Sequence, residues 1–359
     1  MFGRPLRALI ATLLALVLVL AACGNDDAAG PSIDEFDDPA DAVLAAFSQV
    51  EAGATEYRIS FDGTAADLAT LMEASGEPMA DDPSTQMALD LMAGAEFQVS
   101  GAGDDVAMAM ILDGDAVFEM RSIGTTAYGR VDMERIIEII SESDPAAAME
   151  FEMIMGIAPM FAMEDPRLGF ITDLLEGNWV SMDVPPDSDF ADLYDSTDGE
   201  SIDEEVLSVL EEIIEANTSV TQSGEARGGD LFIVEVDVAS ALAAIGRNPL
   251  AADALELGSD FAGDPDEIAR EMAEDGLAST WSFDVVITDG QISSMRMDFA
   301  ELSTEAPEGA SLPILIEFAS SPSGPSAPSD HTPIDPDLIE ELLGPMMMMG
   351  GMGDPGMGF

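Results

Sequence analysis

Strict alternation of apolar and polar side chains marks several stretches of the chain. Tyr57, Ile59 and Phe61 alternate with polar neighbours, and the same period of two recurs over 281–288. After Asp289-Gly290 the pattern returns. Because successive side chains of a strand point to opposite faces of a sheet, these stretches predict strands with one dry and one solvated face. This arrangement is typical of antiparallel sheets.

Short turns connect the predicted strands. Asp113-Gly114 and Asp289-Gly290 suit the positive φ angles of two-residue hairpin turns, and Gly228-Gly229 marks another hairpin. Pro313 indicates a sheet edge for the last strand, because proline has no N–H to donate. The further strands predicted from the pattern cover 96–100, 106–112, 116–123, 125–131, 179–184, 220–227, 230–238, 292–299 and 312–318.

Helical spacing of apolar residues appears between the strands. Pro39 opens the first helix, and Pro78 and Pro83 divide a helical insertion over 65–93. Another helical insertion, rich in methionine, follows residue 143. The order of elements predicts an α+β fold with a curved antiparallel sheet, a half-barrel, covered on one face by helices. Further predicted helices cover 39–52, 133–143, 168–175, 206–216, 239–245 and parts of 249–274.

The first 22 residues have the pattern of an export signal. Arg4 and Arg7 precede an apolar run over 8–20, and small residues precede Cys23. Leu-Ala-Ala-Cys resembles the lipobox of bacterial lipoproteins, in which the thiol receives a diacylglyceryl group and cleavage makes the cysteine the first residue. The alternatives are an ordinary signal peptide with a chance cysteine, or an N-terminal membrane anchor. The resemblance implies a lipoprotein carrying palmitate-type acyl chains at Cys23, held outside the cytoplasm on the cell membrane.

The leader and the changes in composition predict four segments. Residues 1–22 are the lipoprotein signal peptide, and 23–38 are a flexible acidic spacer. Residues 39–319 form one domain with the methionine-rich helical inserts. Residues 320–359 are a Pro/Ser-rich linker followed by a Met/Gly-rich disordered tail.

The charge of the chain limits its partners. The formal net charge is −61, and all eleven basic residues are arginines. Such a surface is unsuited to nucleic acid, whose phosphates need clustered cations. The acids are spread along the whole chain, which favours adaptation to salt or a GC-rich genome over divalent-cation binding. We therefore predict no metal site.

The sequence also argues against an enzyme. The one histidine, His331, lies in the Pro/Ser-rich segment, and no GxSxG or phosphate-binding loop is present. If Cys23 is lipidated, no thiol remains for catalysis, a disulfide or zinc. The methionines are open to three interpretations: a flexible cavity lining, plain core filling or Cu(I) capture by thioethers. No cofactor is predicted.

Several stretches resemble the LppX/LprAFG lipoprotein family of actinobacteria and, at the level of fold, LolA and LolB. They are the helix–strand unit over 39–61, Asp113-Gly114 with its strand to Arg121, Tyr128-Gly129-Arg130, and 285–297 around Asp289-Gly290. The chain departs from that family in length, methionine content and acidity. The resemblance implies a LolA-like fold and a lipid-binding function.

The leading hypothesis is a lipid-anchored protein that binds or carries lipid or lipoprotein acyl chains in a hydrophobic cavity between sheet and helices. Such a carrier needs a dry cavity, because acyl chains cost about 0.8 kcal/mol per methylene in water. The alternative is a surface lipoprotein with a filled core that acts as a binding or scaffolding module. A solute-binding protein of a transporter is disfavoured because parallel α/β patterning is absent. The predicted partners are acyl chains and the membrane; the sequence identifies no protein partner. The predicted cavity-lining residues, all on the dry faces of strands, are Tyr57, Ile59, Phe61, Phe97, Val99, Phe118, Met120, Trp281, Phe283, Val285, Met295 and Met297.

Overall fold

The structure is a computed structural model of the chain and describes most of its predicted domain. It divides into two compact units, one made of residues 1–98 and 199–323, the other of 99–198 and 324–359. The described residues are 36, 38–47, 55–74, 83–102, 105–143, 145–184, 204–255, 263–307, 309–320, 324–335 and 338. Cys23, the rest of the spacer except residues 36 and 38, and the tail over 339–359 lie outside them. The boundaries predicted for one domain and its flanking segments stay predictions.

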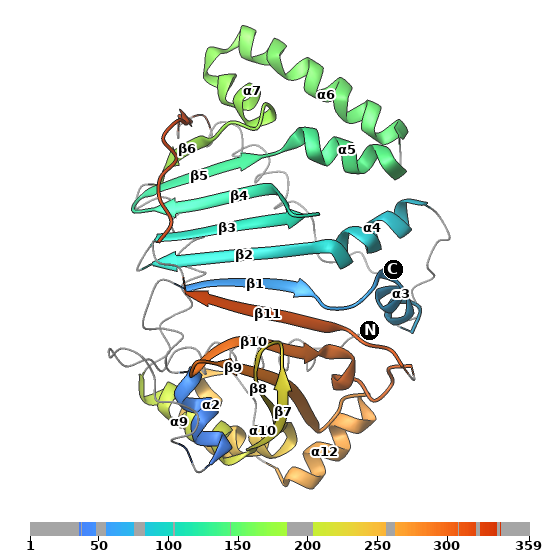
Figure 1. The fold of residues 1–359 in the computed structure, drawn as a ribbon, viewed down its shortest axis with the longest axis vertical. Coiled ribbons are helices and arrows are strands. Elements are labelled where there is room, and N and C mark those ends of the chain that lie inside the picture. The colour runs from blue at the N-terminus through green and yellow to red at the C-terminus, as the bar shows by residue number, and fades with distance from the viewer. Residues whose placement is uncertain are drawn as a thin grey trace. The chain divides into compact units, whose positions relative to one another are not determined.

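The fold is α+β in both units, and the sheet is antiparallel, curved and unclosed, with helices packed on it. In the first unit the strand order is β1-β11-β10-β9-β8-β7, and every neighbouring pair is antiparallel. Figure 1 shows these strands curving around helices. The strands are β1 (Thr55–Phe61), β7 (Thr218–Ala226), β8 (Gly229–Asp237), β9 (Thr280–Thr288), β10 (Gln291–Asp298) and β11 (Pro313–Ser320). The helices are α2 (Pro39–Phe47), α3 (Ala65–Ala74), α4 (Pro83–Gly94), α9 (Glu204–Ala216), α10 (Val238–Arg247), α11 (Pro249–Ala254) and α12 (Pro265–Glu274), with a 3₁₀ turn η4 (Phe299–Leu302).

The described part of the second unit has a smaller sheet and three α-helices. Its strands follow the order β3-β4-β5-β6-β12, antiparallel except for the parallel pair β6–β12. The boundary between the units falls inside β2 (Ala95–Ala102). The strands are β3 (Asp105–Leu112), β4 (Asp115–Ile123), β5 (Thr126–Val131), β6 (Val180–Asp183) and β12 (Thr332–Pro333). The helices are α5 (Met133–Ser143), α6 (Pro145–Glu164) and α7 (Gly169–Leu175), with a 3₁₀ turn η2 (Pro166–Leu168).

Two of the predicted hairpin turns are confirmed and one is shifted. Asp113 and Asp289 have φ near +50°, and each is followed by a glycine with positive φ. The third turn uses Arg227 and Gly228 rather than Gly228-Gly229. Gly229 instead begins β8, where an added Cβ would lie 2.4 Å from the carbonyl oxygen of Ile287. Close contact between strands, not turn geometry, therefore requires that glycine.

The prediction of an edge position for the last strand is wrong. β11 lies between β1 and β10 in the interior of the first unit's sheet. Pro313 is the first residue of β11, where the missing N–H interrupts no ladder, and its carbonyl accepts from Asp62 N–H at 2.8 Å. Proline in a sheet is found either on an edge strand or at the first residue of a strand, and Pro313 is an example of the second case.

Residues 324–335, which follow β11 in the chain, belong to the second unit and form contacts within it. β12 pairs with β6, and the hydroxyl of Thr332 donates to Asp173 at 2.8 Å. Ser326 accepts a hydrogen bond from Arg121, and the ring of His331 meets Tyr128 edge-on at 5.2 Å. The only histidine of the chain therefore lies against an aromatic ring.

Candidate ligand-binding surfaces on the sheet

Five of the predicted lining residues lie in a packed core. Trp281, Phe283 and Val285 point from β9 to the side of the sheet that α2, α9, α10 and α12 cover. Met295 and Met297 lie beside them on β10, and all five are almost fully buried. The ring of Trp281 packs against Phe283 and Phe299 at 5.5 and 5.7 Å between ring centres. Helical side chains occupy the space that an acyl chain would need here.

One small crevice remains at the rim of this core. It has a volume of about 50 Å³ and lies between α2, α9 and the strands β7 to β9, with Phe47, Ile214 and Phe283 among its walls. An apolar cavity that accepts benzene measures about 150 Å³, and typical ligand pockets measure roughly 300–1,000 Å³. In this conformation the crevice is therefore too small for an acyl chain.

Other predicted residues lie on a less covered part of the same unit. Tyr57, Ile59 and Phe61 share one face of β1 and pair with apolar residues of β11. They are partly exposed, and burial raises the pKa of the Tyr57 phenol. We call this set the β1–β11 apolar face; its members are Tyr57, Ile59, Phe61, Ile314, Ile316 and Phe318. Phe97 in β2 is half exposed.

The second unit presents a more exposed apolar surface. Phe118 and Met120 of β4 pair with Met110 and Met108 of β3, so the four side chains share a face. Val106 continues this face, and Val106, Met108 and Phe118 are 37–39% exposed. We call these five residues the β3–β4 apolar face. Val99, in β2, is partly exposed as well.

The sequence pattern missed three members of this surface. Val106, Met108 and Met110 alternate with Ala107 and Ala109, so both sets are apolar. The exposed face could have been identified from side-chain size rather than polarity, because the large side chains point to one side of β3 and the alanines to the other. The cross-strand register with Phe118 and Met120 identifies the side.

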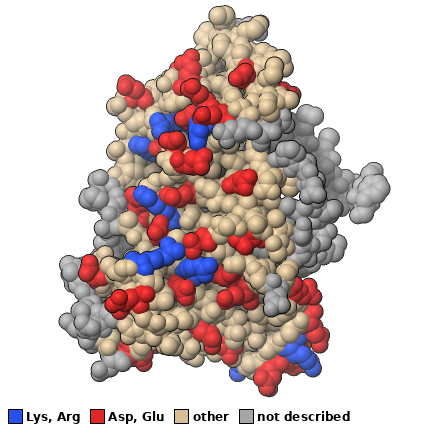
Figure 2. Space-filling view, turned by 45° about the vertical axis from the view of Figure 1, so that its right-hand side comes forward, with Lys and Arg blue, Asp and Glu red and all other residues tan. Residues whose placement is uncertain are grey.

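The opposite face of the same hairpin is charged. Glu119 lies within ion-pair distance of Arg121 and Arg130, and both guanidinium groups lie over the ring of Trp179 at 4.5 and 5.3 Å. In the first unit Asp62 pairs with Arg227 at 3.1 Å and Arg296 at 2.9 Å. Figure 2 shows arginines lying among acidic side chains on the displayed surface. Each of these two carboxylates is shared by two arginines, so the ion pairs neutralise about half of the arginine charge and hold the guanidinium groups in place.

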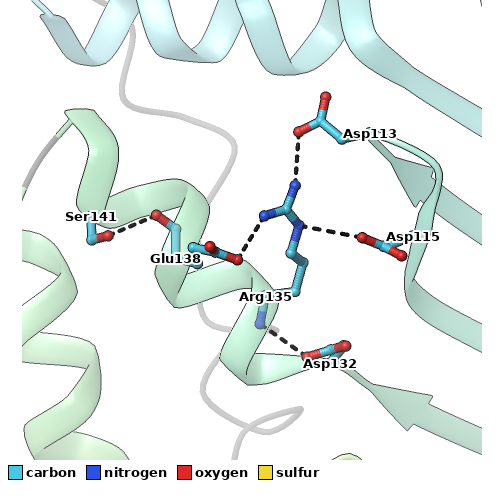
Figure 3. A network of polar contacts seen from close by, with 6 residues as sticks. All are labelled: Asp113, Asp115, Asp132, Arg135, Glu138 and Ser141. Carbon is cyan, nitrogen blue, oxygen red and sulfur yellow. Dashed lines mark hydrogen bonds and ion pairs between the residues drawn. The ribbon is translucent and has the colours of Figure 1, made fainter.

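A polar network fixes the end of the β3–β4 hairpin to α5. Arg135 of α5 reaches Asp113 at 2.9 Å and Asp115 at 3.9 Å, both at the hairpin turn, and pairs with Glu138 at 2.6 Å (Figure 3). The carboxylate of Asp132 accepts from the backbone N–H of Arg135 at 2.9 Å and stabilises the start of the helix. The hydrogen bond that Arg135 donates to Glu138 and the charges of Glu138, Asp113 and Asp115 raise the pKa of Arg135. The network therefore holds the turn of the hairpin whose apolar face is exposed.

Within the described ranges, no three His, Cys, Asp or Glu side chains gather closely enough to hold a metal ion. None of the helices in those ranges is long and apolar enough to cross a membrane.

Comparisons with known proteins give little further information. No protein-family model and no curated protein matches the chain. Among solved structures, the crystal structure of the Mycobacterium tuberculosis lipoprotein LppX is similar over 83% of this chain and 97% of LppX. The TM-score is 0.28 and the sequence identity 8%, so the likeness is distant and identifies neither ligand nor activity.

Proposed function

We propose that this protein is a lipid-anchored, extracytoplasmic, non-enzymatic protein that binds acyl chains on an exposed apolar face of its sheet. The anchor is the lipid on Cys23, as the leader sequence implies. The observation that carries the binding proposal is the β3–β4 apolar face, where Val106, Met108 and Phe118 are more than one third exposed. Such grouped exposure on a sheet face is typical of an interaction surface.

The physical reason for acyl chains is the character of this face. Its members are aliphatic, aromatic or thioether side chains without a hydrogen-bonding group. Methionine is flexible and polarizable and adapts to chains of varied shape. Each methylene that leaves water for this surface contributes about 0.8 kcal/mol. The charged groups Glu119 and Arg121 point to the other side, so they do not interrupt the apolar surface.

The binding proposal is tested by native mass spectrometry of the purified mature protein, with lipid extraction to identify what co-purifies. Phe118→Asn places an amide in the β3–β4 apolar face and is expected to lower lipid occupancy several-fold. Ile233→Asn is the matched control, because Ile233 is 36% exposed on β8, opposite Asp284 in the other strand. Equal occupancy in both variants, or no lipid in the parent, argues against this site.

The packed core of the first unit favours a second candidate function. Trp281, Val285 and Met295 are buried among packed side chains, and the crevice at the rim of this core is small. A filled core suits a surface lipoprotein that acts as a binding or scaffolding module and carries nothing. Absence of lipid from the parent protein, together with stability that depends on this core, is the outcome expected for that function.

A further inference from the structure

Helix α6 of the second unit exposes an unusual apolar surface. It is 20 residues long and lacks basic residues, and Met149, Met153 and Met160 are 61–70% exposed. Met163 reaches 85% exposure and Ile157 reaches 42%. Large apolar side chains are normally covered in a soluble fold, so such exposure indicates an interaction surface.

These five side chains lie along one side of the helix. At about 100° per residue, positions 149, 153, 157, 160 and 163 fall within roughly 120° of the circumference. At about 1.5 Å per residue they span roughly 21 Å along the axis. We call Met149, Met153, Ile157, Met160 and Met163 the α6 stripe.

The other side of α6 carries contacts with the rest of the unit, although Phe151 on that side is 41% exposed. Ala148 is buried and Met155 is partly buried, and both lie away from the α6 stripe at helical spacing. The helix packs against α5, α7 and the turn η2. In Figure 1 the neighbouring helices lie along one side of α6. The α6 stripe therefore faces outward without a partner in the described part of the unit.

Charge decides which occupant suits this stripe. Glu150 and Glu152 flank it near its first turn, and the stretch 153–163 contains no charged residue in a chain of formal net charge −61. A second copy of so acidic a chain brings repulsion and no complementary charge. The stripe also lacks Trp, Tyr and Arg, which usually anchor protein interfaces. Flexible methionine side chains without neighbouring charges are suited to contact with the fluid acyl chains of a membrane.

We propose that the α6 stripe inserts into the acyl boundary of the membrane, so that the helix lies in the plane of the lipid surface. The uncharged end, from Met153 to Met163, enters the lipid, while Glu150 and Glu152 stay at the headgroups. No basic side chain of α6 attracts anionic lipid, so the helix binds neutral, zwitterionic lipid. The proposal rests on the proposed anchor at Cys23, which brings the chain to a membrane.

The test uses the lipidated mature protein in phosphatidylcholine vesicles. Met153→Cys and Met92→Cys each supply a thiol for an environment-sensitive fluorophore, and the two positions are matched at 61% and 59% exposure on helices α6 and α4. Cys23 is the only native cysteine, and its sulfur is blocked if it is acylated. The expected result is a blue-shifted label at position 153, quenched by lipids brominated in the acyl chain, and an unchanged label at position 92.

The outcomes separate the two proposals. Protein that floats with vesicles while the label at 153 stays unquenched overturns insertion and leaves the anchor intact. If the fluorophore reacts with the unsubstituted parent, the thiol of Cys23 is free and the anchor is overturned. Quenching of the label at position 153 in that case still supports insertion. Equal quenching at 153 and 92 indicates non-specific adsorption and overturns the proposal. A blue shift at 153 without vesicles that vanishes on dilution indicates a second copy or an intramolecular cover and also overturns it.

Discussion

Val285→Trp distinguishes a filled core from a ligand cavity in the first unit. Val285 is fully buried on β9 and pairs with Phe232 on β8 and Met295 on β10, both of which are also buried. Tryptophan is much larger than valine, and Val285 does not line the small crevice at the rim of the core. The larger ring must therefore displace packed atoms of the sheet or of the covering helices.

The expected magnitude follows from overpacking. Adding volume to a well-packed core costs typically about 1–3 kcal/mol. At about 2–4 °C per kcal/mol for domains of 150–250 residues, the Tm falls by roughly 2–12 °C. Ile233→Trp is the matched control, because Ile233 lies one residue before Val234 on the neighbouring strand and is 36% exposed. Its Tm is expected to change by less than about 2 °C, since surface changes usually stay within about 0.5 kcal/mol.

The assay combines thermal melts by circular dichroism with lipid quantification on the same samples. A lower Tm for Val285→Trp with unchanged lipid supports a filled core and a binding site elsewhere. An unchanged Tm with lost lipid refutes the reasoning, because it requires a ligand-filled space beside Val285. Equal loss of Tm in Ile233→Trp attributes the effect to tryptophan itself rather than to burial.

Three further predictions concern the anchor, the charge and the hairpin network. Cys23→Ala leaves the precursor uncleaved and removes incorporation of a palmitate analogue in metabolic labelling; label retained on the variant contradicts the anchor. The Tm of the parent rises from low to molar salt, because screening weakens repulsion in a chain of net charge −61; a flat series contradicts salt adaptation. Arg135→Met lowers the Tm slightly at low salt and less at molar salt, because it removes the ion pairs with Asp113 and Glu138; an unchanged Tm at low salt shows that the network adds no stability.

Local patterns predicted the elements better than their arrangement. The alternation around Ile59 and Phe283 and the turn at Asp289 are encoded within a few residues, so β1, β9 and the β9–β10 hairpin agree with prediction. The interior position of β11 depends on pairing with β1, from the other end of the unit, and Pro313 gave a misleading local signal. Strand order is a property of the whole sheet, which no window of sequence contains.

For the candidate site too, the local pattern was predictable and the packing around it was not. Strand alternation placed Phe283 and Val285 on the dry face of β9, but it could not tell how completely helices cover that face. The cover consists partly of side chains from α9 and α10. The sequence pattern predicts these helices but does not show how closely they pack against β9. For the cavity-lining role itself, all twelve residues remain predictions. Register, not sequence, identified Met108 as a neighbour of Met120.

The pairing of β1 with β11 has a consequence for the order in which the chain can fold. Thr55 faces Ser320 and Phe61 faces Ile314, so most of the described chain lies between the two partners. During synthesis, a strand that leaves the ribosome early must wait for a partner that leaves near the end. Contacts this distant in sequence make folding slow, because the intervening loop must close first. Neither unit is complete until the late segment has emerged, and until then β1 presents, on the side where β11 pairs, unpaired backbone groups that a chaperone or a neighbouring chain can occupy.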